Sequence, residues 1–254
     1  MRRVVLALAI ALVFPAAAQA ANPVISAAKK SSTAKSTRLQ LHTATSASNA
    51  PTVVMTGSGV TSGTSASLHM NTTVVGQRVA MDAIGLVEGG HYVMYMRSPV
   101  LQGQLPKGKT WMRIDLQTAG GSVGIDLGSL IGQEGTLAPL AHGLVSTKRL
   151  GTARIAGKAS THYRAVVDLR KAALALPAYA KQLAMIERAT GIRLGRVTQD
   201  VWIGSDGRIR RLRTTTPTVS NGARGKSVQT LTFLAYNVPV SISAPARATV
   251  FDAS

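Results

Sequence analysis

The segment Gly120–Gly124 reads GGSVG and matches the G-x-S-x-G pattern of a hydrolase nucleophile. That chemistry needs Ser122 on a tight turn that follows a strand and opens a helix in an alternating βα chain. Gly128 and Gly132 would weaken such a helix, and the chain has no alternating βα pattern. We interpret the match as chance and predict no catalytic residue, although a hydrolase that uses Ser122 stays as one hypothesis.

Metal and redox chemistry have little support in the composition. The chain has no cysteine, which excludes disulfides, thiolate metal sites and thiol catalysis. None of its five histidines lies four residues from another, so the ligand spacing of a zinc-binding helix is absent. The ten acidic residues form no pair at helical spacing. We predict a protein that is not an enzyme and that uses no metal and no cofactor.

Methionines are the residues most suited to binding an apolar ligand. Met70, Met81, Met94, Met96 and Met112 fall on neighbouring segments with alternating polarity. Thioether side chains adapt to irregular apolar shapes such as acyl chains, but they also fill ordinary protein cores. The sequence alone leaves both roles open.

Four arginines form the densest basic cluster, and the whole chain carries a formal net charge of +19. Arg208, Arg210, Arg211 and Arg213 lie on one segment with strand character. They are typical of an exposed edge strand protected by charge. They would also suit contact with anionic lipid headgroups or an anionic wall polymer. Both interpretations stay open.

The N-terminus has the pattern of a secretory signal peptide over residues 1–20. Two arginines precede an apolar run from Val4 to Phe14, and Ala18-Gln19-Ala20 fits signal-peptidase cleavage. The run is short for a membrane span. We therefore predict export to the cell envelope or the extracellular space, which argues against nucleic acid as a partner. Retention of the leader as an anchor is the alternative.

Secondary-structure patterns predict strands separated by inserted helices. Residues 21–37 form a spacer or a short helix, and residues 38–116 alternate with period two between short turns, as in an antiparallel meander. Short helices follow over residues 120–143, with a loop at Gln133–Gly135. After two further strands, Leu169–Thr190 has a helical stripe that Asp168 can cap and Pro177 should break. The remaining residues return to strands.

This order of elements predicts an α+β fold. We expect one large curved antiparallel sheet, a half-barrel of about ten strands, closed by two or three helices. The domain would span residues 38–254.

Several segments together resemble the LolA-like lipoprotein superfamily, in particular its LppX/LprA/LprF/LprG branch. They are YVMYMRSP from Tyr92, LPKGKTWMRIDL from Leu105, GTARIAGKASTHYRAVVDLRKA from Gly151, and DVWIGSDGRIRRLR from Asp200. The tail from Phe233 to Asp252 also fits. The resemblance implies a half-barrel whose apolar cavity, between sheet and helices, binds acylated lipids or glycolipids without enzymatic activity. Unlike the lipoproteins of that family, this chain has Ala20-Ala21 and no lipobox cysteine, so we expect no acyl anchor.

The leading hypothesis is an exported lipid- or glycolipid-binding protein that carries acyl chains passively. An anionic membrane surface or wall polymer and an envelope membrane protein are further possible partners. A non-enzymatic envelope sensor or protein-interaction module of the same fold is the alternative. The residues expected to line the cavity are Leu68, Met70, Ile84, Leu86, Met94, Met96, Met112, Ile114, Leu183 and Ile186.

Overall fold

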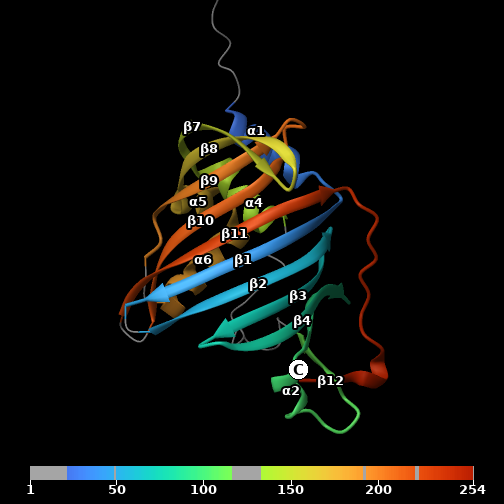
Figure 1. The fold of residues 1–254 in the computed structure, drawn as a ribbon. Helices are drawn as coiled ribbons and strands as arrows, with labels where there is room; N and C mark the ends of the chain where they lie inside the picture. Colours follow the sequence, from blue (N-terminus) through green and yellow to red (C-terminus); the bar gives the residue numbers. More distant parts are fainter. Residues whose placement is uncertain (1–21, 49, 116–132, 191–192, 221–222, 254) are drawn as a thin grey trace, which may run out of the picture.

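The computed structural model describes residues 22–48, 50–115, 133–190, 193–220 and 223–253 (Figure 1). The strands are β1 (Ser36–Ala47), β2 (Ala50–Ser62), β3 (Ser65–Val74), β4 (Gln77–Glu88), β5 (His91–Arg97), β6 (Trp111–Asp115), β7 (Leu144–Ile155), β8 (Lys158–Asp168), β9 (Arg196–Gly204), β10 (Ile209–Ser220), β11 (Ala223–Tyr236) and β12 (Val250–Asp252). The helices are α1 (Pro23–Ser32), α2 (Pro99–Gln102), α4 (Gln133–Gly143), α5 (Leu169–Ala175) and α6 (Pro177–Thr190), with a 3-10 turn at Arg247–Thr249. The predicted signal peptide and Ser122 lie outside the described residues.

The described strands form one twelve-stranded sheet in the order β12-β6-β5-β4-β3-β2-β1-β11-β10-β9-β8-β7. Two antiparallel meanders, β1–β6 and β7–β11, are joined where β1 pairs with β11. β12 pairs in parallel with β6, and the segment before it runs past the strand ends to reach that edge (Figure 1). The predicted α+β class with a large antiparallel sheet is confirmed. The number of strands exceeds the expected ten because β1 and β2 are rich in small polar residues, which weakens their alternation.

Local sequence signals position the helices. The side chain of Asn22 accepts a hydrogen bond from the amide of Val24 at 3.0 Å, and Pro23 occupies the first turn of α1. Asp168 caps α5 by accepting from the amides of Arg170 and Lys171, as predicted. Pro177 separates α5 from α6, which confirms the predicted break. α4 begins at Gln133, so the loop expected at Gln133–Gly135 is instead the start of a helix.

The helices α4, α5 and α6 lie together on one side of the sheet (Figure 1). α1 packs against α4, β9 and β10, and α4 packs against β7 and β8. Val24, Leu137 and Leu140 are fully buried and belong to the same core cluster as Leu39 and Leu68 of the sheet. α1 is therefore part of the folded core, although the domain was expected to begin at residue 38. None of the described helices combines the length and apolarity needed to cross a membrane.

Burial of tyrosines makes the fold sensitive to high pH. Burial raises the pKa of Tyr179 to about 12, above its ordinary value of 10, and Tyr179 packs against the core from α6. The unfolded chain therefore ionises first, so this contribution is complete below pH 10 and is lost as the pH rises toward 12. We expect Tyr179→Phe to reduce the alkaline loss of unfolding free energy by about 2 kcal/mol. Urea unfolding between pH 8 and pH 12 measures this. Equal alkaline losses in both proteins would contradict it.

Candidate functional site

All the methionines of the strands lie on the helix-facing side of the sheet. Residues directly opposite on antiparallel strands point to the same side. Met70 is opposite Met81, and Met96 is opposite Met112. Met70 is 3% exposed and belongs to the core cluster that includes the helices. The strand register places the full set on this face: Met55, Met70, Met81, Met94, Met96 and Met112.

We call these six residues the methionine face. Their side chains are not equally buried. Met94 is 1% exposed, whereas Met55, Met81, Met96 and Met112 are only half-buried. Half-buried thioethers on one continuous face form an apolar surface that can adapt to a flexible ligand.

The strand register also determines which predicted cavity residues share this face. Leu68 and Ile114 join Met70, Met94, Met96 and Met112 there, because Leu68 is opposite Ala83 and Ile114 is opposite Met94. Leu183 is buried in the core from α6. Ile186 lies in α6, but its side chain is outside the described part.

Ile84 and Leu86 are corrections to the predicted set. Ile84 is opposite Tyr95 and Leu86 is opposite Val93, so both point away from the helices. On β4 the helix-facing residues are Met81, Ala83 and Gly85, and the residues between them point to the opposite side of the sheet. Apolar residues occur at both odd and even positions of β4. The alternation of polarity alone therefore could not show which side of this strand faces the helices.

Sequence reasoning left Met55, Met81 and Tyr92 out of the expected lining. Tyr92 lies on the same face, over Gly85 of the neighbouring strand, where an added Cβ would collide with the tyrosine ring. Gly59 is covered in a similar way, because a Cβ there would come within 2.5 Å of Leu68 Cδ2. The residue type, together with the position in the alternating pattern of each strand, could have identified Met55 and Met81. The glycine contacts depend on the cross-strand register, which the local pattern does not contain.

The arginine cluster is not on an edge strand, because β10 lies between β9 and β11. Arg210 is 8% exposed, and its Nη2 lies 2.5 Å from Asp206 Oδ2. Arg208 donates to the backbone oxygen of Lys30, and Arg211 donates to Thr232 Oγ1 at 3.2 Å. Arg213 is exposed. Arg210 is therefore a buried structural residue rather than a contact for an anionic surface, and Arg213 is the most accessible of the four.

The buried position of Arg210 predicts a clear difference between neighbouring arginines. Arg210→Ala removes a partner of Asp206 and leaves a space beside Tyr236, whose ring centroid is 5.8 Å from Arg210 Cζ. We expect it to lower the unfolding free energy by about 2 kcal/mol. Arg213→Ala on the same strand should change it by less than about 0.5 kcal/mol. Urea denaturation of both variants measures the difference, and equal values would be inconsistent with this assignment.

The acidic side chains of the described part are engaged in ion pairs with basic side chains. Of the ten acidic residues, Asp126 and Glu134 lie outside the described side chains. Each of the others lies within ion-pair distance of a basic side chain. Most lysines and arginines of the described part are exposed, so they can attract anions.

The comparisons with known proteins concern the fold. No family model matches the sequence, and no curated protein matches it significantly. Among solved structures, LprF from Mycobacterium bovis aligns with a TM-score of 0.53 at 15% identity, covering 88% of this chain and 95% of that one. LppX from Mycobacterium tuberculosis gives 0.47 at 14%, covering 87% and 100%. A LolA superfamily protein from Nitrosomonas europaea gives 0.28 at 9%, covering 86% and 93%.

The chain has an LprF-like fold. The fold implied by the sequence resemblance to the LolA-like superfamily is thereby confirmed.

Proposed function

We propose that the protein is an exported, non-enzymatic lipid- or glycolipid-binding protein of the cell envelope. Acyl chains would lie along the methionine face, between the sheet and the helices. The observation that carries this proposal is the placement of six methionines from five consecutive strands on one face of an LprF-like sheet, four of them half-buried.

The binding would be passive. Each methylene that leaves water contributes about 0.8 kcal/mol, so an acyl chain supplies its own driving force. Methionine side chains have several rotatable bonds and can repack around chains of different length. Release would need only an acceptor that offers an equally apolar environment.

The charge and the missing lipobox cysteine suggest how the protein would meet a membrane. Because the given sequence contains no cysteine, we propose that no thioether-linked lipid anchor holds the protein at a membrane. Exposed basic residues such as Arg213 would instead contact anionic headgroups or a wall polymer, at about 1 kcal/mol for each residue near the surface. An envelope membrane protein is a further proposed partner.

Native mass spectrometry of the exported protein, followed by solvent extraction, tests the proposal. We expect a discrete excess mass that extracts as an acyl lipid. A clean apo mass that stays unchanged after incubation with membrane lipids would reject lipid carriage and favour the alternative, an envelope sensor or interaction module of the same fold.

A further inference from the structure

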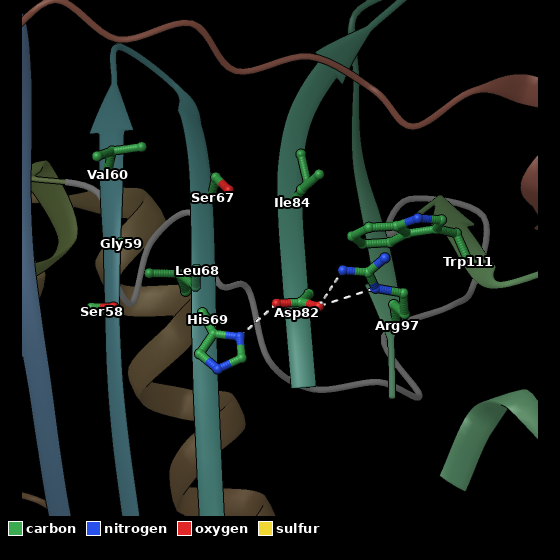
Figure 2. Close-up of a pocket in the computed structure, with 10 residues that line it drawn as sticks. All are labelled: Ser58, Gly59, Val60, Ser67, Leu68, His69, Asp82, Ile84, Arg97 and Trp111. Atoms are coloured by element: carbon green, nitrogen blue, oxygen red, sulfur yellow. Dashed lines mark hydrogen bonds and ion pairs between the residues drawn. The ribbon is translucent and has the colours of Figure 1, made fainter. Parts of the chain in front are cut away.

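A second feature lies on the sheet face opposite the methionines. There a pocket of about 360 Å³ opens over β2–β6 and is lined by residues of all five strands (Figure 2). It is separate from the proposed lipid site, because its lining side chains point away from the helices.

The pocket floor consists of two parallel rows of side chains, which the strand register defines. One row is polar and crosses four strands: Ser58, His69, Asp82 and Arg97. The other lies two residues further along each strand and is mostly apolar: Val60, Ser67 and Ile84. Trp111 stands at one end, where Arg97 Cζ is 4.7 Å from its ring centroid (Figure 2). Two residues along a strand correspond to about 6.6 Å, comparable to the width of one sugar ring.

The polar row is internally charge-balanced. Asp82 Oδ1 lies 2.7 Å from His69 Nδ1, and Arg97 donates to Asp82 Oδ2 through Nε at 3.0 Å and Nη2 at 2.7 Å (Figure 2). Partial burial raises the pKa of Asp82, but the hydrogen bonds from His69 and Arg97 outweigh it, and the pKa is lowered overall. Asp82 is therefore a carboxylate, and Arg97 neutralises it.

The hydrogen-bond network also determines which ring nitrogen of His69 donates and which accepts. With Nδ1–H donating to Asp82, Nε2 is the acceptor that faces the amide nitrogen of Asn71 at 3.4 Å. The row thus offers carboxylate lone pairs as acceptors and the remaining guanidinium nitrogen, Nη1 of Arg97, as a donor.

This combination selects the ligand chemistry. An anion at Nη1 of Arg97 would lie beside the Asp82 carboxylate and be repelled by it, and a cation at Asp82 would be repelled by Arg97 in the same way. A purely apolar ligand would desolvate the ion pair without compensation. A neutral ligand with hydroxyl groups can both donate to Asp82 and accept from Arg97, and one with an apolar face can also lie against Ile84 and the Trp111 ring. A pyranose ring has both properties.

We infer that the pocket on the β2–β6 face opposite the methionines is a binding site for a neutral saccharide. The sugar ring would pack on Ile84 and Trp111, and its hydroxyl groups would bind Asp82 and Arg97.

A similar cluster on the same face provides a matched control. Asp200 contacts His162 at 3.2 Å and Arg164 at 3.1 Å, as Asp82 contacts His69 and Arg97. There, however, His162 stacks on Trp202 at 4.2 Å, and Arg211 lies 5.8 Å from the same ring. Two groups, a histidine and an arginine, lie on the Trp202 ring, whereas Arg97 is the one such group recorded on Trp111 among the described residues, so this cluster has less ring surface to offer a sugar.

The test is a titration of the ¹⁵N-labelled full chain with neutral trisaccharides, namely maltotriose, cellotriose, mannotriose and N,N′,N″-triacetylchitotriose, at millimolar concentrations. We expect at least one of them to shift the indole N–H signal of Trp111 and to leave that of Trp202 in place. Asp82→Asn should weaken this binding about tenfold, whereas Asp200→Asn should not change it. Ser67→Leu, which fills the pocket without touching the ion pairs, should abolish binding in a folded protein.

A free oligosaccharide and the sugar headgroup of a glycolipid present the same chemistry, and the titration separates them. A Trp111 shift with free trisaccharides supports a soluble glycan. A shift only with monogalactosyl-diacylglycerol vesicles, lost in Asp82→Asn but kept in Met96→Trp, supports a headgroup. No shift with either probe, or a shift that survives both Asp82→Asn and Ser67→Leu, would overturn the saccharide site while leaving the proposed lipid function untouched.

Discussion

Replacing Met96 with tryptophan is expected to remove bound lipid from the protein while the sheet stays folded. Met96 lies on the methionine face of β5, between Ala83 of β4 and Met112 of β6, and is only half-buried. The indole would therefore fill space next to the sheet that we assign to acyl chains. Met94, at 1% exposed, is less suitable, because overpacking a filled core costs about 1–3 kcal/mol.

Native mass spectrometry of the exported variant measures this effect as the fraction of protein that carries lipid. We expect a loss of at least tenfold, which corresponds to about 1.4 kcal/mol of binding free energy. Leu86→Trp is the matched control, because Leu86 lies on the neighbouring strand but points to the opposite face. A folded Met96→Trp that keeps its lipid, or an equal loss in both variants, would rule out the methionine face as the lipid site.

Replacing Val24 with aspartate is expected to destabilise the fold strongly. Val24 is 0% exposed and lies on the buried side of α1, in the core cluster shared with Leu140 and Leu39. An unpaired carboxylate there would lose its hydration without gaining a partner, which we expect to cost more than about 3 kcal/mol. The loss is large against the total stability of a typical domain, which is about 5–15 kcal/mol.

Ser26→Asp is the control for the helix itself. Ser26 is exposed in the first turns of α1, where a negative charge interacts favourably with the helix dipole. We expect its urea midpoint to equal or slightly exceed that of the wild type. If Val24→Asp had the same midpoint as Ser26→Asp, α1 would be a peripheral segment, as the predicted start of the domain at residue 38 would have it.

Much of the fold could be predicted because its signals are local. The alternation of Leu68 and Met70 with His69 and Asn71 is typical of a strand with one buried face, and the structure has β3 there. Asp168 and Pro177 determine where α5 begins and ends through a side-chain cap and a missing amide hydrogen. These effects act within a few residues, so neighbouring letters of the sequence contain them.

Which residues belong to the candidate sites depends on contacts between residues that are distant in the sequence. Whether Ile84 or Ala83 faces the helices is decided by the register of β4 against β3 and β5, since a change of one residue exchanges the two faces of a strand. The burial of Arg210 depends on β10 lying inside the sheet.

By itself, the sequence determined an α+β chain with a methionine-rich apolar set and a strong positive charge. Only the tertiary structure placed the six methionines on one face and the ion pair of Asp82 and Arg97 on the other. The physical reason is that alternation with a period of two residues divides the side chains of a strand into two sets but does not show which set faces the helices. The pairing of β1 with β11 and the packing of the helices decide this.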